Sequence, residues 1–144
     1  INTYQIFRNT LLKRIKPLNN SIYNIHDPLG IKLLCRLRFG FSRLREHKFR
    51  HNFLNTLNPM CSCSLEPETT SHFLLHCPNF TNLRLTLMSN LNDIDPTISS
   101  LDDANLVNLL LFGKDSFNNK KNKKVLEKTI EFLKTSLRFD ESLF

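Results

Sequence analysis

Four side chains with soft metal-binding atoms lie within 17 residues, and this cluster constrains the chain more than any other feature. Cys61-Ser62-Cys63 is followed by His72 and then by Cys77, which gives the spacing C-x-C-x8-H-x4-C. Thiolate and imidazole groups bind Zn²⁺ in a closed tetrahedron, and a short loop can supply all four ligands. The alternative is that the cysteines are small core residues with no metal. We favour the metal site, with structural zinc.

The fourth ligand has two candidates. Cys77 stands five positions after His72, about 140° further round a regular helix, so it reaches the same metal only if the helix ends there. Pro78 favours such an ending. His76 is the other candidate, because residues at i and i+4 share one helix face. Thiolate softness favours Cys77. Cys35 falls on the buried side of an earlier predicted helix, and we expect it to be a packing residue.

Apolar residues recur at helical spacing throughout the chain, and no segment shows the alternation of a strand. We therefore expect an all-α fold, a single small domain over 1–144 with an inserted zinc knuckle and a short β-turn at Cys61-Ser62-Cys63. Residues 28–91 would hold basic helices and the knuckle, and 100–139 a C-terminal helical segment. Helices are expected over 2–16, over 28–40 behind an Asp27 cap, over 43–56, in a short segment before Pro78, from Phe80 onward, after Ser100 up to Gly113, and over 117–138, with a loop at 92–100.

Positive charge is concentrated in the first part of the chain. Residues 1–60 hold eleven Lys and Arg against two acids, a net charge of +9, whereas residues 61–144 carry a net charge of −2. Such asymmetry favours a surface that binds a polyanion. No apolar run approaches the roughly 18–20 residues that span a bilayer, and nothing resembles a signal peptide. We expect an intracellular protein with no membrane partner.

The basic side chains between 32 and 50 alternate with phenylalanine and histidine. Arginine forks fit phosphates, and aromatic rings can stack on unpaired bases. The alternative is a pair of amphipathic helices whose phenylalanines are core and whose charges are only solvated. The residues predicted to contact nucleic acid are Lys32, Arg36, Arg38, Arg43, Arg45, Lys48 and Arg50.

Catalytic patterns are weak in this chain. Asp102 and Asp103 are adjacent, but acids at the start of a predicted helix are accounted for by the helix dipole. No Ser, His and Asp grouping rises above chance, and there is no glycine-rich phosphate loop. We expect no enzymatic activity from these residues and no small-molecule substrate.

Several runs of the sequence carry a likeness to a known family. LCRLRFG at 34–40, LREHKF at 44–49, PMCSC at 59–63 and ETTSHFLLHCP at 68–78 follow one another, with LLFG at 110–113 and FLKTSLRF at 132–139 near the end. Over about residues 28–139 the chain resembles the C-terminal region of non-LTR (LINE-type) retrotransposon reverse transcriptase polyproteins.

This resemblance implies a Cys/Cys/His/Cys zinc knuckle with Cys61, Cys63, His72 and Cys77 as ligands. It also implies binding of RNA or DNA in support of target-primed reverse transcription, with the reverse transcriptase domain of the same polyprotein as a partner. The chain would then be a C-terminal fragment, as its first residue Ile1 also suggests, of a parent that is an RNA-directed DNA polymerase. Its expected location is the nucleus or a cytoplasmic ribonucleoprotein. A zinc-stabilised protein-interaction or scaffolding module is the alternative function.

Overall fold

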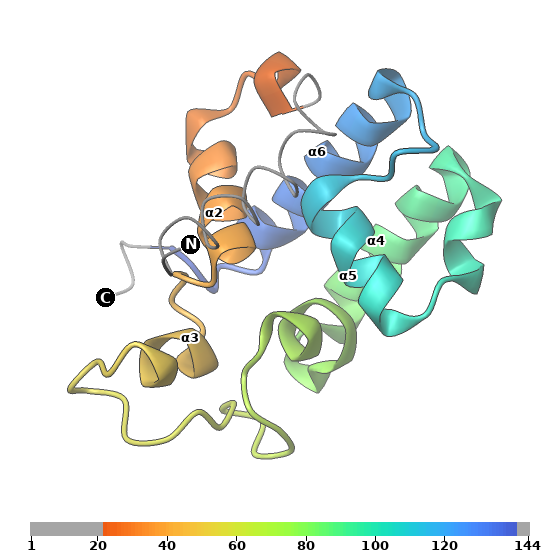
Figure 1. Cartoon of the computed structure of the whole chain (residues 1–144). Helices are drawn as coiled ribbons and strands as arrows, with labels where there is room; N and C mark the ends of the chain where they lie inside the picture. Colours follow the sequence, from red (N-terminus) through yellow and green to blue (C-terminus); the bar gives the residue numbers. More distant parts are fainter. Residues whose placement is uncertain (1–21, 141–144) are drawn as a thin grey trace, which may run out of the picture.

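The computed structural model describes residues 22–140, and all the regular elements among them are helices (Figure 1). One isolated antiparallel bridge joins Met60 to Pro67. The expected helix over 2–16 lies outside the described residues. None of the described helices is both long enough and apolar enough to cross a membrane. In chain order the elements are η2 (Ile22–Asn24), α2 (Pro28–Phe39), α3 (Arg45–Arg50), η3 (His72–His76), η4 (Pro78–Phe80), α4 (Thr81–Ile94), η5 (Pro96–Ser100), α5 (Asp103–Phe112) and α6 (Asn119–Thr135).

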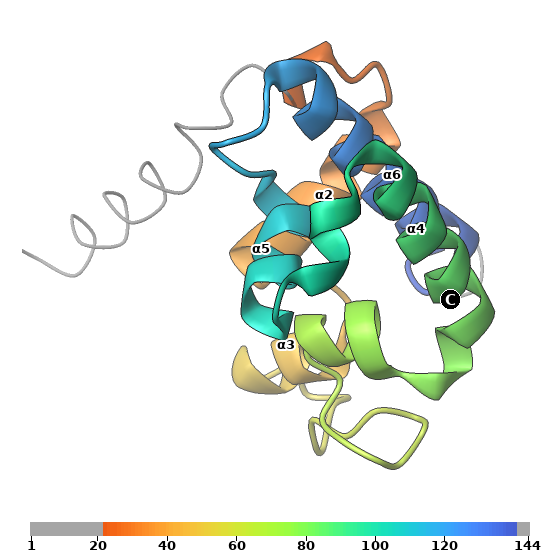
Figure 2. The ribbon, with the colours of Figure 1, turned by 90° about the vertical axis from the view of Figure 1, so that its right-hand side faces the viewer.

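Helix α6 is the centre of the fold and packs against α2, α4 and α5 (Figures 1 and 2). Its contact with α2 is close at Gly30, where an added Cβ would overlap Ile130, so glycine is required there. Phe73 of η3 is fully buried, and its ring contacts those of Phe80, Phe132 and Phe139. This aromatic cluster fixes η3, and with it the cysteine loop, to the helical core.

Several predicted helix ends are confirmed. The Asp27 carboxylate accepts a hydrogen bond from the Gly30 N–H at 2.9 Å and begins α2, and Gly40 ends it with φ 72°. Gly113 follows α5 as expected. The start of α5 differs from the expected start directly after Ser100. Asp102 caps the helix, because its carboxylate accepts a hydrogen bond from the Asn105 N–H. Ser100 instead closes η5, which fills most of the stretch predicted to be a loop.

The helix predicted over 43–56 is much shorter than expected. Helix α3 covers only Arg45–Arg50, and Asn52 then turns the chain with φ 60°, a left-handed conformation that asparagine tolerates better than most residues. The segment beyond it is irregular, so Phe53 and Leu54 are exposed rather than on an apolar helix face. Leu29, in the first turn of α2, is also exposed.

Candidate metal centre

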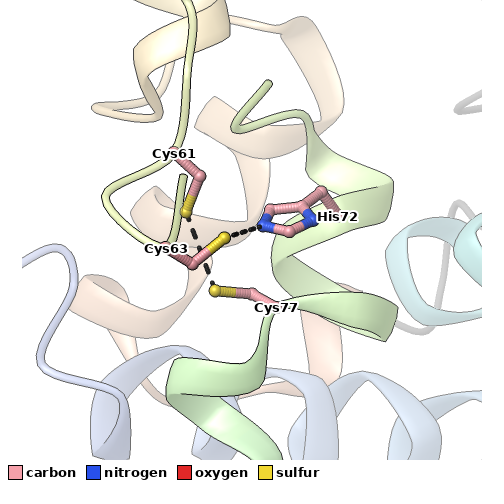
Figure 3. Close-up of side chains that lie close together, drawn as sticks. All are labelled: Cys61, Cys63, His72 and Cys77. Atoms are coloured by element: carbon pink, nitrogen blue, oxygen red, sulfur yellow. Dashed lines mark hydrogen bonds between the residues drawn. The ribbon is translucent and has the colours of Figure 1, made fainter. Parts of the chain in front are cut away.

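The four predicted ligands come together at one point between the cysteine loop and η3 (Figure 3). Their ligand atoms all lie within 4.8 Å of one another. The Cys61 and Cys77 sulfurs are 3.7 Å apart, and the Cys63 sulfur is 3.3 Å from His72 Nε2. Cys61, His72 and Cys77 are buried, and Cys63 is partly exposed. The cluster can bind a metal ion.

Two of these separations, between the Cys61 and Cys77 sulfurs and between the Cys63 sulfur and His72 Nε2, are close to those of a tetrahedral site. With Zn–S bonds of about 2.3 Å and Zn–N bonds of about 2.0 Å, tetrahedral geometry places two sulfurs about 3.8 Å apart and a sulfur about 3.5 Å from a nitrogen. The observed pairs, at 3.7 and 3.3 Å, are close to these values. A larger cation with six or more oxygen ligands would need a wider and harder ligand shell.

The loop that carries the first two cysteines is shaped by its own backbone hydrogen bonds. The Cys61 N–H donates to the Glu66 carbonyl and the Ser64 N–H donates to the Cys61 carbonyl, both at 2.9 Å. The Glu68 N–H donates to the Pro59 carbonyl at 2.8 Å and closes the base of the loop. Ser64 adopts φ 67°. The backbone therefore directs both sulfurs to the same side.

Cys77 reaches the site because the turn before it is wider than a regular helical turn. The Cys77 N–H donates to the His72 carbonyl at 2.7 Å, an i to i+5 bond, and η3 is a π-helical turn. Such a turn brings residues five positions apart onto one side, and π turns are frequent at functional sites. Pro78 then starts a new element. His76 points elsewhere, since its Nε2 is 2.6 Å from the Asp103 carboxylate.

The environment of the Cys77 thiol disfavours its ionisation without a cation. Burial raises the pKa of the Cys77 thiol to about 12, and the neighbouring Cys61 and Cys63 add to the effect. In contrast, a hydrogen bond from the Leu65 N–H helps to lower the pKa of Cys63. A bound divalent cation would reverse this balance, because it attracts all the thiolates at once.

The side of His72 that faces away from the cluster has a carboxylate near it. Its Nδ1 is buried and has no hydrogen-bond partner among the described residues. The nearest carboxylate, that of Glu66, is 3.6 Å away, slightly beyond hydrogen-bond distance. Metal-bound histidines usually donate their second N–H to a carboxylate or a carbonyl group, and a small rotation of the exposed Glu66 side chain would supply this contact.

The predicted nucleic-acid contacts do not all lie on the surface. Lys32 and Arg50 are exposed, and Arg36, Arg43, Arg45 and Lys48 are partly exposed. Arg38 is buried: its Nε donates to the Leu111 carbonyl, and its guanidinium lies over the Phe112 ring. The α2 helix turns Arg38 to the same side as Leu34 and Leu37, so it joins the contact with α5 and leaves the surface.

Two other sequence-based interpretations agree with the structure. Cys35 packs against the hydrophobic core and is not part of the metal cluster. Asp102 and Asp103 have structural roles at the start of α5, where the first caps the helix and the second pairs with His76.

Sequence reasoning missed a buried ion pair beside the metal centre. Glu68 is only 3% exposed, and its carboxylate accepts two hydrogen bonds from Arg138, at 2.6 and 2.8 Å. It also accepts from the Arg45 N–H at 2.8 Å, and Arg138 donates further to the Arg43 carbonyl. The pair thus joins the C-terminal segment, the cysteine loop and the basic segment. Residues 70 positions apart in the sequence give no pattern that predicts this contact.

His47, one of the histidines of the basic segment, is a second buried polar residue whose role the sequence pattern did not predict. It is 3% exposed, its Nδ1 accepts from the Ser42 N–H at 3.2 Å, and its Nε2 lies 3.2 Å from the Thr70 hydroxyl. Burial, reinforced by the charges of Arg50 and His51, lowers the pKa of His47 to about 4. His47 therefore joins the basic segment to the start of the helix that carries His72, in its neutral form.

We expect this lowered pKa to make stability depend on pH. The unfolded chain binds a proton at His47 near its ordinary value of about 6.5, whereas the folded chain does so only near 4, so stability is lost as pH falls between these values. The loss amounts to about 3 kcal/mol. His47→Gln should remove this part of the pH dependence in urea unfolding at pH 4.5 to 7.5. A variant at the exposed His26, His26→Gln, should keep it; equal slopes for the parent and His47→Gln would contradict the assignment.

Comparisons with known proteins add nothing to this description: no protein-family model matches the chain, and searches among curated proteins and among solved structures found no significant match.

Proposed function

We propose that this chain is a nucleic-acid-binding module whose fold is stabilised by one structural zinc ion. Three thiolates and one imidazole form a ligand set that suits zinc, and four protein ligands leave no open position for water or a substrate. The metal would therefore hold the loop at 59–68 against η3 and perform no chemistry. In this proposal no residue of the chain has a catalytic role.

The observation that carries the nucleic-acid proposal is a cluster of cations next to the metal centre. Lys48 has a lowered pKa, first because it is partly buried and then because the positive charges of Arg138, Arg45 and Arg43 surround it. Glu68, the carboxylate among them, is already paired with Arg138. These neighbouring positive charges repel one another, which raises the free energy of the folded chain. A polyanion bound against them would reduce this repulsion.

The resemblance to retrotransposon polyproteins supplies a context for this binding. The proposed role is to hold RNA or DNA for the reverse transcriptase domain of the same polyprotein during target-primed reverse transcription. Arg36, Arg43, Arg45, Lys48 and Arg50, with Lys32, would contact phosphates. Arg38 is left out of this set because it is buried against α5.

A protein-interaction module is the second candidate function, and one observation favours it. Leu54, Leu57 and Leu65 are 93%, 85% and 69% exposed, and all three lie on the irregular segment around the cysteine loop. Neighbouring exposed apolar side chains are typical of protein contact surfaces. Salt dependence separates the two functions, because contacts between apolar surfaces do not release counterions.

The proposed function predicts strongly salt-dependent binding. If about four to six side chains neutralise phosphates, the logarithm of affinity should fall with the logarithm of salt concentration at a slope of roughly −3 to −5. The triple variant Arg43→Gln, Arg45→Gln and Arg50→Gln should bind more weakly and flatten the slope by about 2 to 3. Fluorescence anisotropy with a labelled oligonucleotide between 50 and 300 mM salt measures both quantities.

A variant with the same change in charge serves as the control. Lys120→Gln, Lys124→Gln and Lys128→Gln lie on α6, away from the metal centre, and should leave the slope nearly unchanged. Zinc content should equal that of the parent in both variants. Binding that does not respond to salt, or a triple arginine variant that binds as well as the parent, would favour the protein-interaction function.

A further inference from the structure

A cavity of about 590 Å³ opens between the C-terminal end of α2, the helix α3, the start of the helix around Thr70 and Ser71, and α5. It is in the size range of pockets that bind small ligands or single groups of a larger ligand. Its walls combine apolar side chains, such as Leu37 and Val107, with polar ones. It does not contain the metal ligands, so it is a separate feature of the surface beside the basic segment.

One wall of this cavity is a pair of stacked rings. Phe41 and His51 lie parallel, with ring centroids 4.0 Å apart and an angle of 12° between their planes. His51 is held by a hydrogen bond from its Nε2 to the Gly40 carbonyl at 3.0 Å. The left-handed conformation of Gly40, with φ 72°, turns the chain so that Phe41 follows α2 at this position. Phe41 is 57% exposed although His51 stacks on one face of its ring. An exposed ring held in place in this way is suited to stacking on a base.

The polar groups around the platform are hydrogen-bond donors, a cation and one carboxylate, that of Glu46. The Arg50 guanidinium lies over Gly40, the residue before Phe41; its side chain is 54% exposed and its Nη2 is 3.6 Å from the Glu46 carboxylate. Arg38 forms part of the wall, and its buried Nη2 has no hydrogen-bond partner among the described residues. Asn108 of α5 also lines the cavity, with an amide that both donates and accepts. An aromatic face, a cation and an amide fit a nucleotide, with the base on the ring and the phosphate at Arg50.

We propose that this cavity binds one unpaired nucleobase of a single-stranded nucleic acid, stacked on Phe41, with the adjoining phosphate at Arg50. The inference rests on the proposed function and narrows it. Bases in a duplex are stacked on one another and paired, so they cannot occupy the cavity without being extruded at a cost. A single strand offers its bases freely. The chain should therefore prefer single strands to a duplex of the same sequence.

The test compares Phe41→Ala with Phe53→Ala, which removes an equally exposed ring that does not line the cavity. Affinities are measured by anisotropy at 100 mM salt with a 12-nucleotide single strand, as DNA and as RNA, and with the corresponding duplex. Phe41→Ala should weaken single-strand binding about 5- to 100-fold, the range found when one base-stacking aromatic ring is removed, and should change duplex binding less than 2-fold. Phe53→Ala should leave both unchanged, and both variants should retain the parent's zinc content.

The salt slope distinguishes this inference from the proposed function itself. Phe41→Ala should weaken binding at an unchanged slope, because the ring neutralises no phosphate. Equal losses for single strand and duplex, or equal losses for Phe41→Ala and Phe53→Ala, would overturn the base site while leaving phosphate binding in place. No binding of any oligonucleotide by the parent would overturn the proposed function. If Phe41→Ala unfolds, Phe41→Leu keeps the apolar bulk, removes the ring face and should show the same selective loss.

Discussion

Replacing Cys77 by serine is expected to release the metal ion and to unfold the loop at 59–68 together with η3. A serine hydroxyl is a poor ligand for zinc at neutral pH, and Cys77 is one of the four groups that converge on the site. Zinc binding contributes ~10–16 kcal/mol in comparable small sites, and this free energy is coupled to folding. The rest of the helical core should persist, because α2, α4, α5 and α6 pack together without the loop or η3. Metal analysis of the purified variant and hydrogen exchange over residues 59–77 measure the two effects.

His76→Ala is the matched control, one residue away in the same turn. His76 is 43% exposed at its side chain and contacts Asp103 rather than the sulfurs. An exposed pair of this kind contributes about 0–1 kcal/mol, so the variant should retain one zinc per chain and nearly all of the parent's stability. If instead His76→Ala loses the metal and Cys77→Ser retains it, the fourth ligand is His76 and the π-helical turn described above is wrong. A parent with no stoichiometric metal and freely titratable thiols would contradict the site as a whole.

The metal cluster could be predicted from the sequence because its ligands are close together in the chain. A loop of 17 residues leaves few ways to arrange three thiols and an imidazole, and Pro78 favours a helix end next to Cys77. The choice between Cys77 and His76 could not be made with equal security. It depends on a widened turn, whose Phe73 and Leu74 carbonyls accept hydrogen bonds from Arg84. Spacing alone carries no sign of that support.

The helical class of the fold could be predicted from the sequence. Helix ends could be predicted where the sequence offers a capping side chain or a glycine that ends a helix. Asp27 and Gly40 delimit α2 for local reasons, namely a side-chain cap and a left-handed backbone. The burial of Arg38 and the exposure of Phe53 and Leu54 were not predictable, because both depend on which elements pack together. Arg38 lies against α5 only once the chain has folded. Because α3 ends at Arg50, Phe53 and Leu54 are not on a helix that could pack them against the core.

Loss of Arg138 is expected to have the second large effect. Its guanidinium donates to both oxygens of the buried Glu68 carboxylate and to the Arg43 carbonyl. Arg138→Ala would leave that carboxylate with the Arg45 N–H as its remaining described donor, in a place where water cannot reach it well. Removing one partner of a buried ion pair costs about 3–5 kcal/mol, a large part of the stability of a domain of this size. Urea unfolding with saturating zinc should show a loss of this magnitude, whereas Lys128→Ala, which breaks an exposed pair with Glu131, should cost less than about 1 kcal/mol.

A double variant shows why Arg138 is needed. If the cost of Arg138→Ala comes from the stranded charge of Glu68, then Glu68→Gln with Arg138→Ala should be more stable than Arg138→Ala alone, because the carboxylate that lost its partner is gone. If the cost comes from the contact of Arg138 with the Arg43 carbonyl, the second substitution should recover nothing. The double variant also removes the charges of Glu68 and Arg138, both of which act on Lys48. It should keep its zinc, since neither residue is a ligand.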